Sequence, residues 1–336
     1  MSKNTVGASR QTRFLTDDDV RRVFDWREAS NALRRAYAAA VSDDALPPRT
    51  MARGSGVWLR TLSGISPGGD IMGAKLIAAS IRHRRASYLI PLFDQTSVEL
   101  VALLDGNAIT GFRTAGTSAL AADILTPPGP CRLGVLGSGF EAQNHVRALA
   151  ALRQLEAVSV FSPNPESRAR FVADLADLNV PITPAASARD AMKGANILLC
   201  AARSRGEVAL FDGAWLEPGV TVISIGSTLP EQREIDPETV RRAAVIVADM
   251  LEEVAHDTGD MIAATAAGVT FRNKIVSLSD VIGGRNPGRA TREDIVLYKS
   301  VGSALQDLSI AQMCVARAEE LSVGTLLPVS IAPVEK

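Results

Sequence analysis

Three cationic side chains lie in segments whose neighbours are mostly apolar. Arg49 follows a double proline, Lys75 lies in the run of residues 73–77, and Arg113 belongs to an otherwise apolar helical pattern. A buried charge is costly, so a cation in such a place needs a counter-charge. An acid of the chain or exposure of the charged end to water suffices for any one cation alone. A small carboxylate ligand is the alternative, because arginine binds carboxylates through two parallel hydrogen bonds.

A glycine-rich turn in the middle of the chain could hold a dinucleotide. Its GxGxxA pattern consists of Gly137, Ser138, Gly139, Phe140, Glu141 and Ala142. The first glycine permits a tight turn, the second lets the backbone approach a pyrophosphate, and the small sixth residue allows close helix packing. A buried strand is predicted before the turn and a helix after it, so helix N–H groups can meet phosphates. This context favours a dinucleotide site over a purely structural turn.

The residues after the second predicted strand bear on the choice of dinucleotide. An NAD site usually has an acid there to bind the ribose hydroxyls, but Ser162 occupies that place. The side chains of Ser162, Asn164, Ser167 and Arg168 could bind a 2′-phosphate. The predicted cofactor is therefore NADPH. NADH stays possible, because Glu166 could serve the ribose and Arg168 could belong to a solvated helix face.

Two kinds of scaffold must position these residues. Before residue 126 the pattern predicts a helix over residues 16–40, an antiparallel sheet between residues 56 and 105, and a helix over 107–125. The strands of this sheet are expected at residues 57–62, 71–79, 88–93 and 98–104. The proline-rich run of residues 126–130 is the best candidate for a domain boundary, because proline ends a helix.

After this boundary, apolar strands alternate with helices, which is typical of a parallel sheet covered on both faces. The strands are expected at residues 133–136, 157–161, 197–201, 220–225 and 245–248, and a last long helix at 291–321. Ligands bind at the carboxyl ends of such strands, where Ala201, Ala202 and Gly226 lie. The predicted fold is α/β, with a Rossmann domain over residues 129–303 and a discontinuous α+β domain over 1–128 and 304–336.

Composition excludes several classes of function. The 336 residues contain 36 basic and 37 acidic side chains, so no nucleic-acid partner is expected. No apolar run reaches about 18 residues, so no membrane span is expected. The three widely spaced cysteines are expected to be buried free thiols in a reducing compartment, which predicts a cytoplasmic protein. The scattered cysteines and histidines also predict no metal site.

Several motifs in order resemble those of the ornithine cyclodeaminase and mu-crystallin family. The matching stretches are PPR at 47–49, GAK at 73–75, LDG at 104–106, RTA at 113–115, GSGFEAQ at 137–143, WLEPG at 215–219, GS at 226–227, REID at 233–236, GR at 288–289 and KSVG at 299–302. The resemblance implies a Rossmann domain joined to a substrate and dimerisation domain, and a homodimer. It also implies binding of NAD(H) or NADP(H) and action on amino acids, cyclic imino acids or related imines.

The resemblance also assigns roles to residues. Arg49, Lys75 and Arg113 match the positions that hold the substrate carboxylate, and Lys75 and Arg113 are counted as catalytic. By family position, Thr114, Ser300 and Gly302 are expected at the cofactor, although helix packing explains Ser300 and Gly302 equally well. Asp307, in the last predicted helix, is expected to be an ion-pair partner and not a catalyst.

One departure from the family pattern narrows the activity. Thr228 stands where ornithine cyclodeaminases carry an aspartate that handles the substrate amine. A hydroxyl cannot carry the negative charge that pairs with an ammonium group, so Thr228 favours an imine reductase, with its hydroxyl at the substrate nitrogen. The predicted activity is NADPH-dependent reduction of a C=N bond next to a carboxylate. The alternatives are an amino-acid dehydrogenase, a cyclodeaminase, or a non-catalytic NADPH-dependent protein that binds small ligands.

Overall fold

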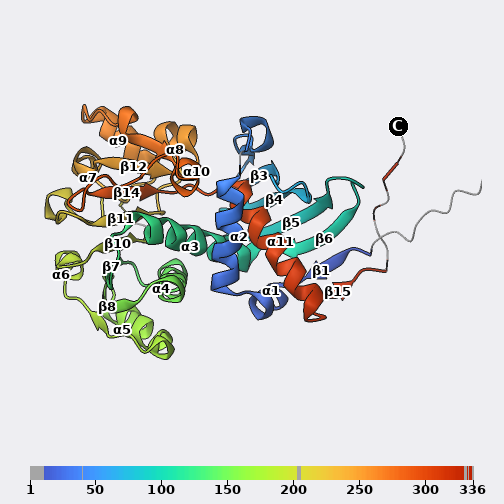
Figure 1. Cartoon of the computed structure of the whole chain (residues 1–336), viewed down its shortest axis with the longest axis horizontal. Helices are drawn as coiled ribbons and strands as arrows, with labels where there is room; N and C mark the ends of the chain where they lie inside the picture. The colour runs from blue at the N-terminus through green and yellow to red at the C-terminus, as the bar shows by residue number, and fades with distance from the viewer. Residues whose placement is uncertain (1–10, 40, 203–205, 329–330, 332, 335–336) are drawn as a thin grey trace, which may run out of the picture. The chain divides into compact units, whose positions relative to one another are not determined.

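The chain divides into two units, one with a mostly antiparallel sheet and one with a parallel sheet, and the α/β class agrees with the predicted fold class. The computed structural model describes residues 11–39, 41–202, 206–328, 331 and 333–334. Unit 1 comprises residues 1–113 and 303–336, and unit 2 comprises residues 114–302. Both ends of the chain therefore belong to unit 1, where the helices near them, α2 and α11, pack against each other (Figure 1).

Unit 1 contains a seven-stranded sheet with the order β15-β1-β6-β5-β4-β3-β2. Its strands are β1 (Arg13–Leu15), β2 (Thr50–Gly54), β3 (Val57–Ile65), β4 (Ile71–Ser80), β5 (Arg85–Asp94), β6 (Leu100–Asp105) and β15 (Thr325–Leu326). All neighbours pair antiparallel except β1 and β6. The four predicted strands are confirmed as β3 to β6, whereas the short strands β1, β2 and β15 were not expected.

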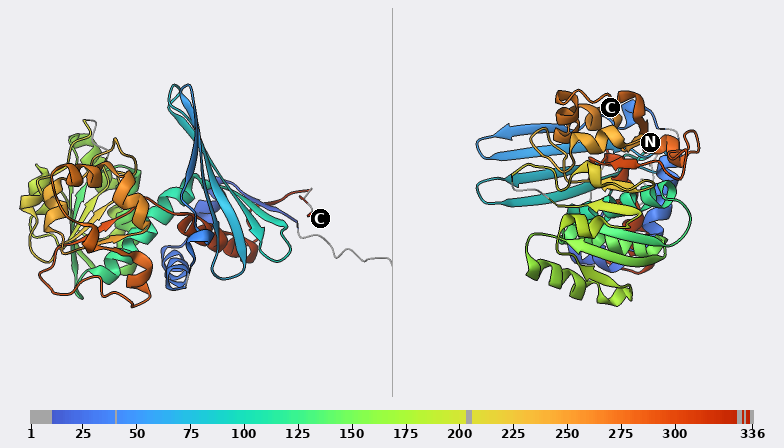
Figure 2. Two further views of the ribbon diagram at one scale, coloured as in Figure 1. Left: turned by 90° about the horizontal axis from the view of Figure 1, so that it is seen from above. Right: turned by 90° about the vertical axis from the view of Figure 1, so that its left-hand side faces the viewer.

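The helices of unit 1 pack beside this sheet, and Figure 2 shows its long strands extending beyond them. They are α1 (Asp17–Val23), α2 (Trp26–Ala38), α11 (Ala304–Glu320) and the short 3-10 helix η1 (Asp43–Ala45). Helix α11 packs across β3, β4 and β5. It approaches closely at Gly73, where an added Cβ atom would lie 3.0 Å from a methyl group of Leu308.

The prediction of one continuous helix over residues 16–40 is wrong, because the chain leaves helical geometry at Phe24 and Asp25. The Asp25 carboxylate accepts hydrogen bonds from the backbone N–H groups of Arg27 and Glu28 and so starts a second helix. Periodicity alone hides this break, because α1 and α2 both bury apolar residues.

Unit 2 contains an eight-stranded sheet with the order β13-β12-β14-β11-β10-β7-β8-β9. Its strands are β7 (Cys131–Leu136), β8 (Leu155–Phe161), β9 (Ile182–Pro184), β10 (Ile197–Cys200), β11 (Thr221–Ser224), β12 (Val245–Ala248), β13 (Ile275–Ser277) and β14 (Val296–Lys299). All pairs are parallel. The strand order reverses between β7 and β10, which is the point where ligands bind in Rossmann folds.

Helices connect these strands, and the five strands predicted for this unit are confirmed. The helices are α3 (Gly106–Leu125), which begins in unit 1, α4 (Phe140–Leu152), α5 (Pro165–Asp174), α6 (Ala188–Met192), α7 (Pro237–Arg242), α8 (Leu251–Asp257), α9 (Gly259–Ala266) and α10 (Leu278–Ile282). Three 3-10 helices accompany them: η2 (Ala176–Leu178), η3 (Gly213–Trp215) and η4 (Arg272–Lys274).

The predicted helix over residues 291–321 is wrong in its first part. Strand β14 lies there, fully buried between β11 and β12, and α11 begins only at Ala304. A central strand of a parallel sheet is a short apolar run without alternation, so its sequence pattern cannot be separated from that of a buried helix.

Candidate functional site

A buried charge network lies in unit 1 and joins two of the three predicted cations. Lys75, on β4, donates a hydrogen bond of 2.7 Å from Nζ to Oδ1 of Asp307, on α11. The Nε atom of Arg113, on α3, lies 3.1 Å from the same oxygen. All three side chains are at least nine-tenths buried. The expectation that Asp307 is an ion-pair partner is confirmed, and the protein itself supplies one counter-charge.

Neutral groups extend this network toward α2. Arg113 donates from Nη1 to the side-chain oxygen of Gln306 over 2.8 Å, and the Gln306 amide donates to the Tyr37 hydroxyl over 2.8 Å. Gln306 precedes Asp307 in α11, so one helical turn contacts Arg113 through both side chains. The orientation of the guanidinium group is therefore fixed by packed secondary structure.

The pKa of Lys75 depends on its burial and on three charged neighbours. Burial lowers the pKa of Lys75 to about 8, and the nearby Arg113 and Arg49 lower it too, whereas Asp307 raises it. Arg49, half-buried in the segment before β2, is thus close enough to act on Lys75. An anion beside Lys75 would favour its charged form, as Asp307 does.

The predicted dinucleotide turn lies at the carboxyl end of β7 in unit 2. Gly137 has a φ of 121°, and an added Cβ atom there would lie 2.4 Å from the carbonyl oxygen of Ala201. Only glycine fits such a position. Gly139 precedes α4 without a side-chain cap, and a Cβ atom added to it would meet no heavy atom within 4 Å. Space for a ligand therefore lies beside the start of α4.

A cavity of about 800 Å³ opens beside this turn. It is lined by Leu136, Gly137, Ser138, Phe161, Ser162, Pro163, Asn164, Ser167, Ala202, Ala209 and Leu210. The structure thus brings together six of the residues predicted to bind a cofactor. The Ser138 hydroxyl donates to the Ser162 hydroxyl over 2.9 Å, and Asn164 caps the N-terminus of α5.

The remaining predicted residues near this turn differ in exposure. Arg168 donates to the Ser162 carbonyl group, and its guanidinium carbon lies 5.6 Å from the centre of the Phe161 ring. Ala142 is fully buried, as close packing of α4 requires, whereas Phe140 is exposed. Arg168 therefore has an ordered position at the end of β8.

His145, which is not among the predicted site residues, is fully buried on α4. One ring nitrogen lies 2.6 Å from the carbonyl oxygen of Glu141 and the other 3.0 Å from the Ser118 hydroxyl on α3. The position of a histidine on the apolar face of the predicted helix was the feature of the sequence that could have revealed this contact. The contact ties the start of α4 to α3, the helix that also carries Thr114, which is half-buried.

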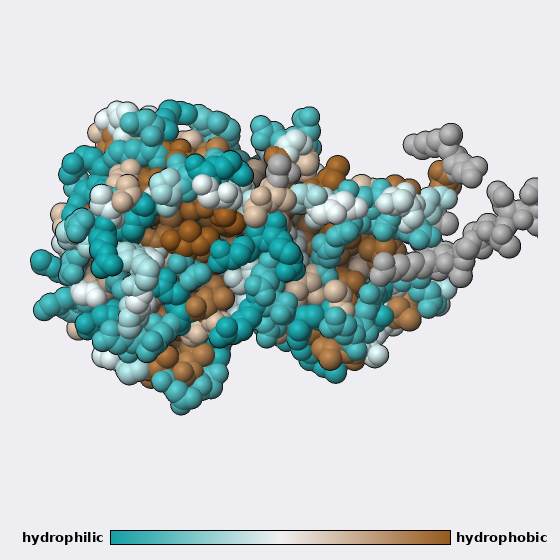
Figure 3. Space-filling model, viewed as in Figure 1, coloured by the Kyte–Doolittle hydropathy of each residue, from teal (hydrophilic) through white to brown (hydrophobic). Residues whose placement is uncertain are grey.

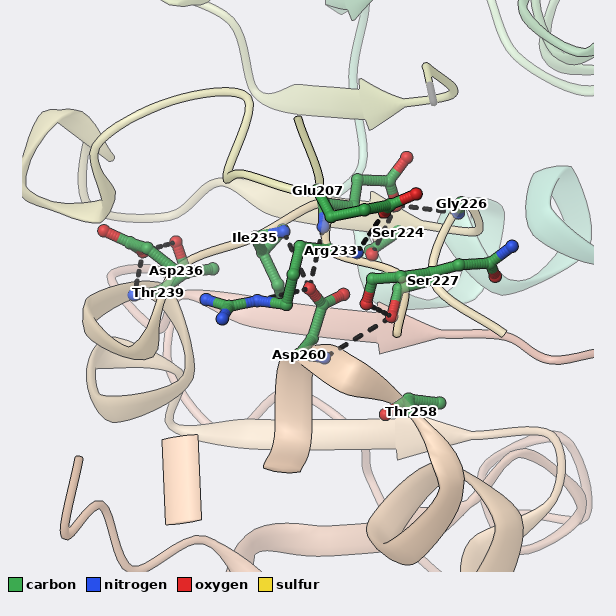
Figure 4. Close-up of polar contacts among 12 residues, drawn as sticks. Glu207, Ser224, Gly226, Ser227, Arg233, Ile235, Asp236, Thr239, Thr258 and Asp260 are labelled. Carbon is green, nitrogen blue, oxygen red and sulfur yellow. Dashed lines mark hydrogen bonds and ion pairs between the residues drawn. The ribbon is translucent and has the colours of Figure 1, made fainter. Parts of the chain in front are cut away.

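Figure 4 shows polar contacts at the carboxyl end of β11, where Gly226 lies. The Gly226 N–H donates to Oε2 of Glu234 over 2.8 Å, and the Ser224 hydroxyl donates to the same oxygen over 2.6 Å. The backbone N–H and hydroxyl groups of Thr228 both lie within 3.2 Å of the side-chain oxygen of Gln232. Thr228, which is half-buried, is therefore held within its own loop.

Glu234 belongs to a buried cluster that sequence inspection did not reveal. Lys299 donates to the Ser224 hydroxyl over 2.9 Å and lies 3.0 Å from Oδ2 of Asp260. Asp260 in turn accepts hydrogen bonds from the backbone N–H groups of Glu234 and Ile235 (Figure 4). Burial raises the pKa of Glu234 to about 7, although Lys299 and two hydrogen bonds oppose the shift.

Ser300 and Gly302 follow β14 and are held by a single acid that was also missed. Asp249, which follows β12, accepts hydrogen bonds from the Ser300 hydroxyl over 2.6 Å and the Gly302 N–H over 2.8 Å. Gly302 has a φ of 81°, which favours glycine. The loop after β14 therefore has a defined shape at the carboxyl edge of the sheet.

The described ranges contain no group of three or more His, Cys, Asp or Glu side chains that could hold a metal ion. Cys131, Cys200 and Cys314 are buried and free, as expected. No helix in the part of the chain that the structure describes has the length and apolar character to cross a membrane. Polar side chains cover much of the face in Figure 3, with an apolar patch over unit 2.

Comparisons with known proteins identify a family and several relatives that this chain resembles. Residues 78–322 match the model of the ornithine cyclodeaminase/mu-crystallin family. The ketimine reductase mu-crystallin of Mus musculus is 29% identical over 264 residues, which cover 76% of this chain and 79% of that protein.

Two solved structures are similar over almost the whole chain. A probable ornithine cyclodeaminase from Bordetella pertussis Tohama I is 32% identical, with a TM-score of 0.83, and the match covers 96% of this chain and 100% of that one. The Delta(1)-pyrroline-2-carboxylate reductase of Thermococcus litoralis, solved with NADH and L-proline, is 25% identical. Its TM-score is 0.87, and the match covers 94% of this chain and 100% of that one.

Proposed function

This chain belongs to the ornithine cyclodeaminase/mu-crystallin family, and on that basis we propose that it reduces imines with NAD(P)H. The substrate would carry a carboxylate next to its C=N bond, and the product would be an amino acid. The observation that carries this proposal is the buried arrangement of Lys75 and Arg113 around one oxygen of Asp307 in unit 1. The ketimine reductase from mouse and the pyrroline-carboxylate reductase from Thermococcus support the same reaction class.

The substrate carboxylate is assigned to the three cations of unit 1. Lys75 and Arg113 share one oxygen of Asp307, which neutralises only part of their charge. A carboxylate that approaches Arg49, Lys75 and Arg113 would balance more of it, and arginine can bind it through two hydrogen bonds. With a pKa of about 8, Lys75 is mostly protonated at neutral pH and can release its proton at modest cost.

The cofactor is assigned to unit 2, whose glycine turn and cavity fit a dinucleotide. The pyrophosphate would lie beside Gly139, where the structure leaves open space at the start of α4. The bound cofactor supplies the hydride, and the protein supplies binding and orientation. We assign the remaining contacts to the other turn residues, to Thr114 on α3, and to residues that follow strand ends: Ala201, Ala202, Gly226, Ser300 and Gly302.

NADPH is the proposed cofactor. Ser162 lines the cavity at the position where an acid would favour NADH. Ser162, Asn164 and Ser167 line the same cavity, and Arg168 donates a hydrogen bond to the Ser162 carbonyl group. These polar groups and one positive charge would neutralise and bind a 2′-phosphate, whereas an acid would repel it.

Thr228 favours reduction over cyclodeamination. Its neutral hydroxyl can hydrogen-bond to the nitrogen side of a substrate but cannot balance an ammonium group. The loop contact with Gln232 shows that this hydroxyl has a defined direction. Formation of proline and ammonia from ornithine would point instead to a cyclodeaminase.

The test is oxidation of NADPH and of NADH with cyclic 2-imino acids of five- and six-membered rings. Linear imines from pyruvate or glyoxylate with an amine are measured beside them. Replacing Lys75 with Ala should lower kcat/KM by about 100-fold or more, while NADPH binding persists. Replacing the exposed Lys193 with Ala is the matched control and should change neither quantity.

Each failure has a different meaning. Tight NADPH binding without turnover of any imine would favour a non-catalytic ligand-binding protein. Near-normal turnover after the change of Lys75 would reject its assignment while keeping the reaction. Turnover of free amino acids alone, with NADP⁺ or NAD⁺ reduced, would identify an amino-acid dehydrogenase.

We also propose a homodimer that forms through the sheet of unit 1. Lys75 faces α11, so its neighbours in β4, Ala74 and Leu76, point to the opposite face. Leu89 pairs with Leu76 and is 41% exposed, and Leu59, 44% exposed, lies on the same face through its pairing with Ala78. A second copy could bury these apolar groups. Light scattering should give a dimer mass, which Leu89→Glu should reduce.

A further inference from the structure

A single carboxylate oxygen orients both buried cations of unit 1. Oδ1 of Asp307 lies 2.7 Å from Lys75 Nζ and 3.1 Å from Arg113 Nε. The other oxygen, Oδ2, is buried and accepts no hydrogen bond from the residues that the structure describes. The two cations, which come from β4 and α3, are therefore aligned through one atom on α11.

Stability alone does not explain this arrangement. A buried ion pair or triad can usually be replaced by apolar residues of similar volume without loss of stability. Burial of the three charged side chains Lys75, Arg113 and Asp307 is itself costly. The close neighbour Gln306 adds a second contact from the same helix to Arg113. Contacts from both Gln306 and Asp307, in one turn of α11, fix the direction of the Arg113 guanidinium group.

We propose that Asp307 is a positioning residue, which holds Lys75 and Arg113 toward the same substrate carboxylate and keeps Lys75 protonated at neutral pH. This inference rests on the proposed function, because it takes the carboxylate to be that of the substrate. Asp307 would act through the two cations and would not touch the reacting atoms itself. It would thus set both the geometry and the charge of the carboxylate site.

The charge effect has a definite direction. The charged groups that act on Lys75 are Arg113 on α3, Arg49 before β2 and Asp307 on α11. Only Asp307 raises the pKa of Lys75, while burial and both arginines lower it. Without the carboxylate, the pKa of Lys75 must fall below its present value of about 8. Lys75 would then lose its positive charge within the neutral range.

The experiment compares full-length Asp307→Asn and Asp307→Glu with the unchanged protein, each saturated with NADPH. Binding of pyridine-2-carboxylate, a planar carboxylate beside a ring nitrogen, is measured by calorimetry from pH 6 to 9. This readout needs no turnover. The pH profile of kcat/KM with an imine substrate is the second readout. Glu320→Gln, at an exposed acid of the same helix, is the matched control.

In the unchanged protein, binding should weaken as the pH rises through about 8. In Asp307→Asn the same loss should occur at least about one pH unit lower, because one pKa unit is a tenfold change in protonation. Asp307→Glu keeps the charge but displaces the oxygen, so its pH profile should stay while the KM rises about tenfold. A purely structural role would lower the melting temperature and leave both pH profiles unchanged.

The inference is overturned if Asp307→Asn binds the carboxylate with the same affinity and the same pH midpoint as the unchanged protein. If the Asn variant does not fold, the Glu variant decides, and an unchanged KM and affinity in it would overturn the inference. Failure of the proposed function looks different. In that case no imine is reduced, but pH-dependent carboxylate binding still responds to Asp307. If the protein neither binds the carboxylate nor reduces any imine, both the inference and the proposed function are overturned.

Discussion

Glutamine in place of Glu234 would remove a carboxyl group that titrates inside unit 2, while nearly keeping its shape. Burial raises the pKa of this group from 4.5 to about 7, and Lys299 only partly opposes the shift. The folded protein therefore binds this proton more tightly than the unfolded chain does. Stability must then depend on pH in a range where ordinary glutamates are already ionised.

The sign and size of the pH dependence of stability follow from the difference between the folded and unfolded pKa values of Glu234. Between pH 4.5 and about 7 the folded state holds more protons than the unfolded state, so the free energy of unfolding decreases as the pH rises. At about 1.4 kcal/mol per pKa unit, the loss is roughly 3 kcal/mol, complete above about pH 7. Glutamine does not titrate. The glutamine lowers the free energy of unfolding because it matches the Ser224 and Gly226 donors imperfectly, and this loss is the same at every pH.

The assay is urea unfolding at pH 5, 6, 7 and 8. Trp215 packs against the core of unit 2 and is the only tryptophan of that unit, so Trp26 and Trp58 are changed to Phe in all proteins compared. From pH 5 to 8, the unchanged Glu234 protein should lose about 2–3 kcal/mol relative to the Gln variant. The control is Glu238→Gln, on the surface of α7.

Two outcomes would refute the reasoning. A difference between the two proteins that stays constant within about 0.5 kcal/mol from pH 5 to 8 would mean that Glu234 titrates as it does in the unfolded chain. With pH 4 added to the series, a gain in the relative stability of the Glu234 protein as the pH rises to 5 would mean that the attraction of Lys299 outweighs the cost of burial. The surface control at Glu238 should show no such trend in either case.

The remaining predictions concern the dinucleotide site and the buried cluster. Gly137→Ala should destabilise unit 2 by more than about 2 kcal/mol in urea, because its Cβ atom would clash with Ala201. Gly139→Ala should keep normal stability but weaken NADPH binding at least about tenfold in a fluorescence titration, since its Cβ atom would enter space assigned to the pyrophosphate. Ser162→Asp should raise the KM for NADPH about tenfold and leave that for NADH nearly unchanged in steady-state kinetics. Lys299→Met should cost about 3–5 kcal/mol in urea, because it leaves two buried acids with less compensation, and the cost should shrink at pH 5.

The dinucleotide turn was predictable from sequence because its determinants are local. Gly137 and Gly139 are separated by one residue, and the strand and helix that flank them are adjacent in the chain. The five strands predicted for unit 2 are apolar runs bounded by turns. This pattern can be recognised without knowing which strands lie beside them in the sheet. Ser162 could be identified because it lies at a fixed distance from the turn.

The rest of the site depends on contacts between distant segments. Lys75 and Asp307 are 232 residues apart, so the sequence gives no sign that they pair. Ser224, Glu234 and Lys299 likewise come from separate segments that meet only in the folded sheet. Strand β14 was mistaken for a helix because all four of its residues are buried, so it lacks the alternation of buried and exposed side chains that marks a strand. Local sequence patterns predict most helices and strands. Which charged side chains pair with one another is decided by the packing of segments that are far apart in the sequence.

The interrupted sequence of unit 1 also has a consequence for synthesis on the ribosome. Unit 2 is continuous, so all of its strands have been synthesised before residues 303–328 are added to the chain. Until then, β1 lacks its neighbour β15, and the apolar face of α2 has no helix α11 to cover it. Lys75 likewise has no Asp307 beside it. A nascent chain that stalls before residue 303 would therefore expose apolar surface, which chaperones and proteases can recognise, and could not assemble its cation site.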